Sequence, residues 1–243
     1  MSLDPEFGAP ARALAIGAHP DDIEFQCGAT LAKWAASGCE VSVLICTDGS
    51  KGSWDPDEDL TELVARRQAE QREAAAALGA TGEVVFLGAV DGELIETREL
   101  RSEIAWWLRT LRPDVVLGHD PWKRYRLHPD HRAAGFLTID SVVAARDPHF
   151  FTDLGLKHHR PDALLLFEAD EPDLHIDVTG FAGTKCDALE CHRSQFRTTM
   201  YIDLDDDGTQ RRAFRNRISD ALAEAGSEVG VTHAERFKRI APL

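Results

Sequence analysis

Short apolar runs alternate with amphipathic stretches along most of the chain, and this alternation predicts its elements. Five apolar runs have the length of buried strands, and one further segment alternates like a half-buried strand. These segments are 13–17, 40–47, 83–87, 114–122 (a strand with its exit), 163–167 and 174–178. Helix-forming stretches follow at 28–36, 60–78, 97–111, 131–145, 181–192 and 210–225. Because strands alternate with helices, we expect one Rossmann-like α/β domain of three layers: a mainly parallel sheet with helices on both faces.

Single residues mark where some predicted elements end. Gly38 stops the first helix, and Pro113 ends the third because the residue before proline disfavours helix. The acidic stretch 203–208 resembles a calcium loop, but Phe214 stands where such a loop needs its glutamate, so we expect a solvated run of charge. A basic element at 233–240 closes the chain.

We expect one domain over residues 11–243, because no linker or internal repeat divides this stretch. Residues 1–10 resemble a leader added for expression, without fixed structure. They contain neither the basic region nor the apolar core of a signal peptide.

The composition excludes several classes of protein. With 43% apolar residues in 243, the chain can bury a full core, so disorder is not expected. A net charge of −15 argues against nucleic acid or an anionic membrane surface as a partner. No run approaches the roughly 18 apolar residues that a membrane helix needs. The five cysteines form no C-x-x-C pair, which favours a reducing cytoplasm and excludes a thiolate zinc site. The oligomeric state stays open, a homo-oligomer included.

Candidate chemistry gathers first in the turn His19-Pro20-Asp21-Asp22, between the first strand and the first helix. Ligands of open α/β sheets bind beyond the carboxyl ends of strands, which is where this turn lies. His19 and Asp22 are three residues apart and can reach one metal ion, which leaves Asp21 free for another task. In a second interpretation these aspartates only start the helix, as an N-cap and as negative charge at the positive end of its dipole.

A second cluster, His128-Pro129-Asp130-His131, again lies between a strand and a helix. If His19, Asp22 and one histidine of this cluster bind one ion, they leave an open coordination position, as catalytic zinc sites do. Such an ion lowers the pKa of bound water to about 7, and Asp21 is placed to accept its proton. The remaining histidine, if protonated, stabilises an oxyanion or protonates a leaving amine, with Asp130 fixing its tautomer and raising its pKa.

These parts suit metal-assisted hydrolysis of an amide or ester. Two histidines and one carboxylate also form the facial triad of non-haem iron(II) oxygenases, which we rank lower because those sites usually lie in β-barrels.

The sequence resembles the LmbE-like (PIG-L) family of zinc-dependent N-acetylglucosamine deacetylases over about residues 12–200. The two separated His/Asp motifs, in this order, carry the resemblance. The matching segments are His19-Pro20-Asp21-Asp22-x-Glu24, Gly28-x-Thr30-Leu31, Thr47-Asp48-Gly49, Arg67-x-x-Glu70, Asp91-Gly92, His128-Pro129-Asp130-His131-Arg132, Lys185 and His192-x-Ser194-Gln195.

The resemblance implies a role for each matching residue. In this family pattern one zinc ion per chain is bound by His19, Asp22 and His131. Asp21 is the general base, and His128, oriented by Asp130, is the oxyanion-stabilising or acid partner. Arg67 and Asp91 contact the amino sugar. Two simpler interpretations stay open: Arg67 pairs with Glu70 along its helix, and Asp91-Gly92 is only a turn.

The implied reaction removes acetate from a small N-acetylglucosaminyl conjugate. An amidase acting on a larger glucosamine amide, such as a thiol conjugate, is the alternative within the family. A sugar-binding module without activity is a different class, against which the intact His and Asp residues of both motifs argue.

The chain departs from the family pattern in two loops. Ser50 follows Gly49 where a glutamate is common, and Arg126 stands where some members have a tyrosine, with Tyr125 beside it. Together with Lys123 and Arg124, Arg126 favours an anionic group on the substrate. We expect the loops 47–56 and 121–127 to line the rim of the pocket.

Overall fold

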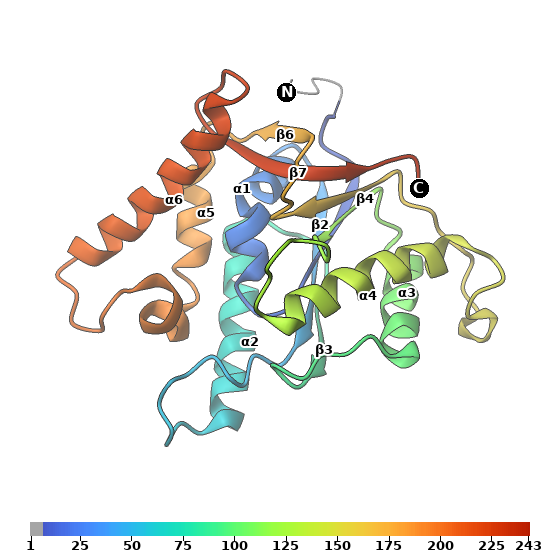
Figure 1. Cartoon of the computed structure of the whole chain (residues 1–243), viewed down its shortest axis with the longest axis horizontal. Coiled ribbons are helices and arrows are strands. Elements are labelled where there is room, and N and C mark those ends of the chain that lie inside the picture. The colour runs from blue at the N-terminus through green and yellow to red at the C-terminus, as the bar shows by residue number, and fades with distance from the viewer. Residues whose placement is uncertain (1–6) are drawn as a thin grey trace.

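The computed structural model describes residues 7–243 and shows a seven-stranded sheet between two layers of helices (Figure 1). The strand order is β3-β2-β1-β4-β5-β7-β6, and β1 to β5 pair in parallel. The strands are β1 (Arg12–Gly17), β2 (Glu40–Thr47), β3 (Val84–Ala89), β4 (Val115–His119), β5 (Ala163–Phe167), β6 (Leu174–Asp177) and β7 (Ala234–Ile240). The predicted α/β fold with a mainly parallel sheet is confirmed.

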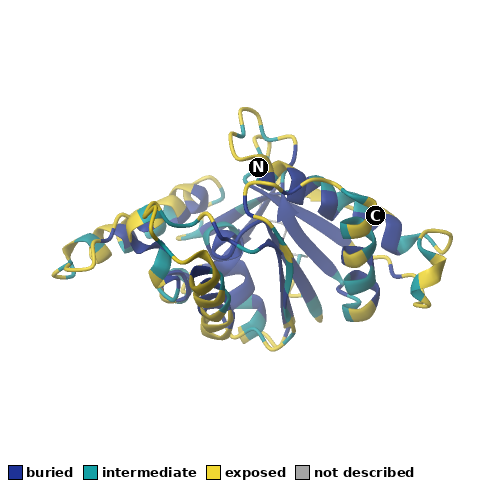
Figure 2. Ribbon diagram, turned by 90° about the horizontal axis from the view of Figure 1, so that it is seen from below, coloured by how far each residue is buried: buried dark blue, intermediate teal, exposed yellow. Residues whose placement is uncertain are grey.

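Alternate residues of the central strands supply two separate cores. Ala13 and Ala15 of β1 face a core shared with α1, α2, α5 and α6, whereas Leu14 and Ile16 face a core shared with α3 and α4. The helices are α1 (Asp22–Ala36), α2 (Leu60–Ala77), α3 (Arg98–Leu111), α4 (Pro129–Arg146), α5 (Ala182–Leu189) and α6 (Thr209–Ser227). Shorter helical turns are Thr152–Leu154, Arg193–Gln195 and the π-helical turn Phe196–Met200. Because both faces of the strands are covered, the sheet is buried (Figure 2).

The strand order places the two His/Asp turns at one point. The sheet grows in opposite directions from β1 and β4, which are neighbours, so the crevice beyond their carboxyl ends is the topological switch point. The turn that begins at His19 follows β1, and the turn that begins at His128 follows the exit of β4.

The largest differences from the sequence prediction concern three elements. The basic element 233–240 is strand β7, which runs antiparallel between β5 and β6. Its charged residues hid the strand pattern, because they alternate with only a few apolar positions. Helix α1 begins at Asp22, six residues before the predicted start, and α5 ends at Leu189, before the predicted end. The acidic stretch 203–208 is a largely exposed turn, as expected.

Part of the expected leader lies outside the described residues, which begin at Phe7. The Phe7 ring lies 6.3 Å from Trp34 of α1, so packing of the domain begins before residue 11.

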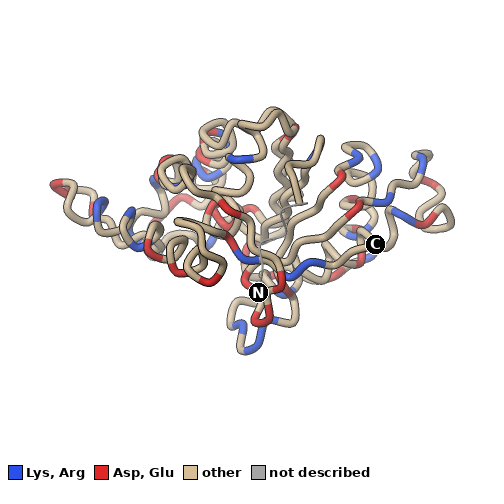
Figure 3. The backbone as a smooth tube through the Cα atoms, turned by 90° about the horizontal axis from the view of Figure 1, so that it is seen from above, with Lys and Arg blue, Asp and Glu red and all other residues tan. Residues whose placement is uncertain are grey.

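The surface carries both signs of charge. Figure 3 shows acidic and basic residues interspersed along the described chain. Within residues 7–243, no helix combines the length and the apolar character that spanning a membrane requires.

Helix α1 is interrupted at Cys27 (φ −139°, ψ 15°), and a buried ion pair occupies the break. Lys185 Nζ lies 2.6 Å from Glu235 Oε1 and donates to the Phe25 carbonyl at 2.7 Å. Glu235 in turn accepts the backbone N–H groups of Ala29 and Thr30 at 3.2 and 2.7 Å. The pair therefore supplies the hydrogen bonds that the break removes from the helix. We call these residues, Lys185 and Glu235 with the Cys27 break, the rear cluster.

Candidate functional site

The turn after β1 holds its two aspartates in different directions. Asp21 has a φ of 100°, a left-handed conformation that is costly for a residue with a side chain. Its N–H donates to Gln71 Oε1 at 3.0 Å, which helps to hold this conformation. The Asp21 carboxylate lies 3.6 Å from Arg67, whereas the Asp22 carboxylate accepts from the His19 N–H at 2.7 Å and faces the histidines.

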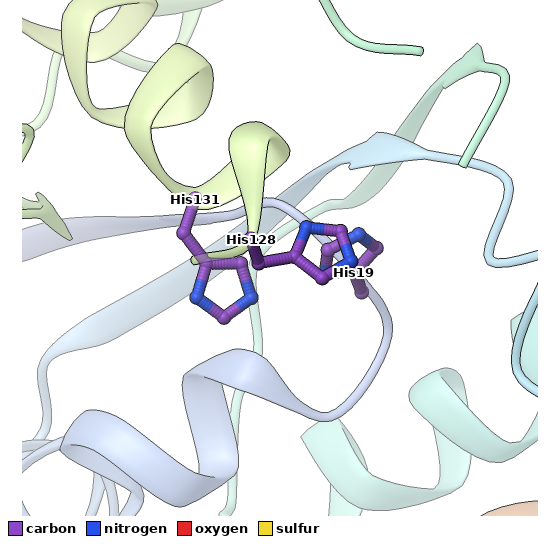
Figure 4. Close-up of side chains that lie close together, drawn as sticks. All are labelled: His19, His128 and His131. Carbon is purple, nitrogen blue, oxygen red and sulfur yellow. The ribbon is translucent and has the colours of Figure 1, made fainter. Parts of the chain in front are cut away.

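The two sequence motifs meet in space, as predicted. Asp22 Oδ2 lies 3.3 Å from His19 Nδ1, and Asp22 Oδ1 lies 3.2 Å from His131 Nε2. His19, His128 and His131 also bring one donor atom each to within 4.8 Å of one another (Figure 4). Imidazole nitrogens and a carboxylate oxygen are the ligand types that Zn²⁺ prefers, so this donor set fits a divalent ion. We call His19, Asp22, His128 and His131 the front cluster.

We expected the Asp130 carboxylate to lie beside His128, but it lies beside His19. Asp130 Oδ2 is 3.1 Å from His19 Nε2, and the carboxylate also accepts the N–H groups of Gly92 and Leu94 at 2.6 and 3.2 Å. Helix geometry explains the difference: His128 is the N-cap of α4, so its Nδ1 accepts the backbone N–H of Asp130 at 3.3 Å. A carboxylate on the far nitrogen of a candidate ligand histidine is the usual supporting contact at metal sites.

The pKa values of His19 and Asp22 show how strongly the carboxylates and imidazoles interact. Burial alone lowers the pKa of His19, but hydrogen bonds to Asp130, Asp22 and Asp91 raise it to about 12. Burial alone raises the pKa of Asp22, but His131 and His119 hold it well below its usual range.

The pKa of Asp21 is shifted in the opposite direction from that of Asp22. Burial raises its pKa to about 6, with Asp22 adding to the rise and Arg67 opposing it. A carboxylate with this pKa is ionised at pH 7 and still binds a proton well.

The pKa of His128 is lowered, so its ring is neutral at pH 7. Burial lowers its pKa, and the neighbouring His19 and His131 lower it further. The raised pKa that we expected from Asp130 is therefore not found, because Asp130 directs its carboxylate at His19.

Sequence reasoning missed His119, the last residue of β4. Its ring is fully buried and stacks on His131 at 4.4 Å between centroids. His119 Nε2 lies 3.3 Å from Asp22 Oδ2, and Nδ1 lies 3.3 Å from Glu168. Asp22, His119 and His131 form a further set of converging donor atoms. The available signal was its position, since the last residue of a parallel strand faces the switch-point crevice.

The front cluster opens into a pocket of about 470 Å³. Besides the site residues, the pocket is lined by Phe25, Gln26, Lys51, Gly52, Gln195 and Thr199. The loop 47–56 lines it as expected. The loop 121–127 does not: its Trp122 and Arg124 line a neighbouring cavity of about 330 Å³.

Arg67 and Asp91 both lie in the pocket wall. Arg67 is 3% exposed and donates to the carbonyls of Pro20 and Gly49 at 2.6 and 2.8 Å. The ion pairs of Arg67 are with Asp21 and Asp91 and not with Glu70, the expected helix partner. Glu70 accepts hydrogen bonds from Ser194 at 2.9 and 2.6 Å. A Cβ at Gly52 would lie 2.3 Å from Arg67 Nη1, so a larger residue there would displace the guanidinium.

Asp91 connects the histidines to the loop after β2. Its Oδ1 is 3.3 Å from His19 Nε2, and its Oδ2 accepts the Lys51 N–H at 3.1 Å. Asp91 is thus more than a turn residue.

Two of the basic residues at 123–126 already have acidic partners in the chain. Lys123 lies 3.2 Å from Asp170, and Arg126 lies between His131 and Glu168. The structure therefore does not support their expected role toward an anionic substrate group.

Comparisons with known proteins show which families and folds this chain resembles. A profile of the PIG-L family, described as GlcNAc-PI de-N-acetylase, matches residues 14–142. A diacetylchitobiose deacetylase from Thermococcus kodakarensis is 38% identical over 199 residues, which cover 81% of this chain and 74% of the relative. A 1D-myo-inositol 2-acetamido-2-deoxy-alpha-D-glucopyranoside deacetylase from Actinosynnema mirum is 34% identical, with 77% of this chain and 81% of the relative covered.

Solved structures show the same fold. An N,N'-diacetylchitobiose deacetylase from Pyrococcus horikoshii, in complex with an inhibitor, superimposes with a TM-score of 0.86 at 31% identity, covering 99% of this chain and 88% of its own. A 4-carboxy-2-hydroxymuconate hydratase from Pseudomonas putida gives a TM-score of 0.76 at 21% identity, covering 96% of this chain and 97% of its own. The second likeness shows the fold alone, so function has to be argued from the site.

Proposed function

This chain belongs to the GlcNAc-PI de-N-acetylase (PIG-L) family, and from that membership we propose that it is a metal-dependent hydrolase that removes the acetyl group from an N-acetylglucosaminyl conjugate. One observation carries the proposal: in the pocket wall the Asp22 carboxylate lies between His19 and His131, whereas the Asp21 carboxylate faces Arg67. A ligand set next to a separate base is what hydrolysis by activated water requires.

We assign one zinc ion to His19, Asp22 and His131. His119 supports Asp22 from the end of β4, with Nε2 beside the Asp22 carboxylate. When bound, such an ion supplies Lewis acidity for the acetamide carbonyl and lowers the pKa of water. Asp130 and Asp91 both lie beside Nε2 of His19 and hold the orientation of its ring.

Asp21 moves the proton in this mechanism. It takes a proton from the attacking water as the bond from the water oxygen to the acetyl carbon forms. When the C–N bond breaks, acetate leaves and Asp21 returns the proton to the amine. Its pKa of about 6 suits both transfers, and Arg67 and Gln71 hold it in place.

His128 stabilises the tetrahedral intermediate as a hydrogen-bond donor. Its Nδ1 accepts a backbone N–H, so the neutral ring carries its hydrogen on Nε2. A donor held by a helix N-cap is already oriented for a developing oxyanion, which is how such groups lower the barrier.

We propose an N-acetylglucosamine conjugate as substrate because the similar enzymes are named for diacetylchitobiose and for an N-acetylglucosaminyl inositol. Asp91 and Arg67 are the proposed contacts to the sugar. The amidase of a larger glucosamine amide or thiol conjugate is the alternative, and the iron enzyme ranks below it. All five cysteines are free, which supports the cytoplasm as the compartment.

The test is release of acetate and free amine. Zinc-loaded protein is incubated with diacetylchitobiose and a panel of N-acetylglucosaminyl conjugates, and both products are measured. Equimolar acetate and amine, abolished by a chelator and restored by zinc, is the expected result. Turnover that requires iron and oxygen would favour the oxygenase. Failure to form product from every N-acetyl sugar in the panel would contradict the proposal.

A further inference from the structure

The contact between Arg126 and His131 has no part in the proposed chemistry. Arg126 Nη1 lies 2.7 Å from His131 Nδ1, and Nη2 pairs with the Glu168 carboxylate. The Arg126 side chain is 12% exposed, so the contact lies inside the protein. A fixed positive charge therefore touches an imidazole assigned to a dication.

The direction of the hydrogen bond in this contact is settled by chemistry. A guanidinium has only donors, so His131 Nδ1 accepts. A neutral ring then carries its hydrogen on Nε2, which faces Asp22 Oδ1 at 3.2 Å. Metal-bound histidines show the reverse arrangement: the far nitrogen donates its N–H to a carboxylate, a carbonyl or water.

We propose that Arg126 lowers the affinity of this site for a divalent ion and that it leaves His131 when the ion binds. With an ion on Nε2, the hydrogen of the His131 ring is on Nδ1, where it opposes an N–H of Arg126. The guanidinium charge adds repulsion, because it lies within hydrogen-bond distance of the imidazole that holds the ion. The assignment of His131 to the metal, on which this rests, is that of the proposed function.

Glu168 keeps Arg126 beside the site in both arrangements. Glu168 follows β5 with a left-handed φ of 59°, which turns its carboxylate back between Arg126 and His119. Arg126 therefore loses one of its two partners when it leaves His131 and retains the other. This makes Arg126 a residue that tunes affinity and does not block binding.

The first experiment measures zinc affinity, by titrating metal-free protein against a chromophoric chelator. Arg126→Gln removes the charge and offers an amide oxygen to the His131 Nδ1–H, so it should bind zinc at least about tenfold tighter, the scale of such supporting contacts. Arg126→Met also removes the charge but offers no amide oxygen to the ring, so it should gain less. Arg124→Gln is the matched control: Arg124 is on the same loop but lines the neighbouring cavity, so affinity should not change.

Equal or weaker zinc binding by Arg126→Gln overturns the proposal. If the unaltered protein takes up no zinc at all, the proposed function fails as well, so the two failures are distinguishable.

The second experiment uses the unaltered protein and does not depend on a variant that folds. Long-range ¹H–¹⁵N spectra of the His131 ring should show its hydrogen on Nε2 without zinc and on Nδ1 with zinc. A hydrogen already on Nδ1 in the zinc-free protein overturns the proposal.

Discussion

Helix α1 takes part in two buried polar clusters, one at its first residue Asp22 and one at its break at Cys27, and they differ in how their hydrogen bonds are shared. In the rear cluster each group has its own partners: Lys185 donates to Glu235 and to the Phe25 carbonyl, and Glu235 accepts two backbone N–H groups. In the front cluster, the single Asp22 carboxylate faces three imidazoles. One nitrogen of His19 likewise faces both Asp91 and Asp130.

This is the difference we expect between a structural cluster and a metal-binding one. A buried ion pair with all its hydrogen bonds satisfied holds its elements in place. A cluster in which many lone pairs converge and compete for few hydrogens is arranged for an ion. The two clusters should therefore fail in different ways: changes in the front should remove metal and rate, and changes in the rear should remove stability.

The largest effect is expected from Asp22→Asn, at the centre of the front cluster. Losing the charge that faces three imidazoles should empty the zinc site and lower kcat/KM by at least about 10⁴-fold, more than the loss of a base alone. Elemental analysis and amine release would measure both. Stoichiometric zinc in this variant would contradict the distinction between the front and rear clusters, because Asp22 would then behave like a structural residue.

Asp21→Asn should separate the base from the ligands within the same turn. The amide is nearly isosteric but cannot accept a proton, so kcat should fall about 10²–10⁴-fold, or about 3–5 kcal/mol, with full zinc and a similar KM. If Asp21→Asn lost its zinc while Asp22→Asn kept zinc and rate, the two roles would be reversed.

In the rear cluster, Lys185→Met should leave the Glu235 charge buried without its partner. We expect a loss of about 3–5 kcal/mol in the free energy of unfolding, measured by urea denaturation, with zinc affinity nearly unchanged. Lys238→Met is the matched control, since Lys238 on the same strand as Glu235 pairs with Asp173 at an exposed position, where such pairs contribute about 0–1 kcal/mol. Equal losses in the free energy of unfolding for the two variants would mean that burial of the Lys185–Glu235 pair does not increase its contribution to stability.

The smallest effect concerns the buried His192, whose Nε2 lies 3.3 Å from Glu24 of α1. Burial alone lowers the pKa of His192, but Glu24 and Asp21 raise it above its ordinary value. A raised folded-state pKa adds stability that is complete below about pH 6.5 and is lost as the pH rises through the folded-state value.

The stability difference between the unaltered protein and His192→Gln should therefore shrink as the pH rises. Urea unfolding of zinc-free protein over a series of pH values would measure it. His158→Gln, at an exposed position, should show no such trend. A difference that grows with pH would mean that His192 is neutral in the folded protein.

Much of the fold followed from local patterns. Apolar runs and helix-forming stretches placed β1 to β6 and all six long helices, because periodicity reports which face of an element is buried. Strand β7 was missed, since a strand that takes its pairing from β5 and β6 needs few apolar residues of its own. The Lys185–Glu235 pair was missed for a related reason: its partners are 50 residues apart, and nothing local shows that α1 breaks at Cys27.

The sequence by itself determined which chemistry is present: the His and Asp residues of the two turns, and their positions at strand ends. Spacing within a turn is local, so the order of His19, Asp21 and Asp22 along the chain was enough to propose separate tasks for them. Only the tertiary structure decided which atoms face each other. The adjacency of β1 and β4 brings the turns together, the N-cap of α4 turns Asp130 toward His19, and the end of β4 adds His119. Side-chain direction depends on neighbours brought in by the sheet order, and that order is a property of the whole chain.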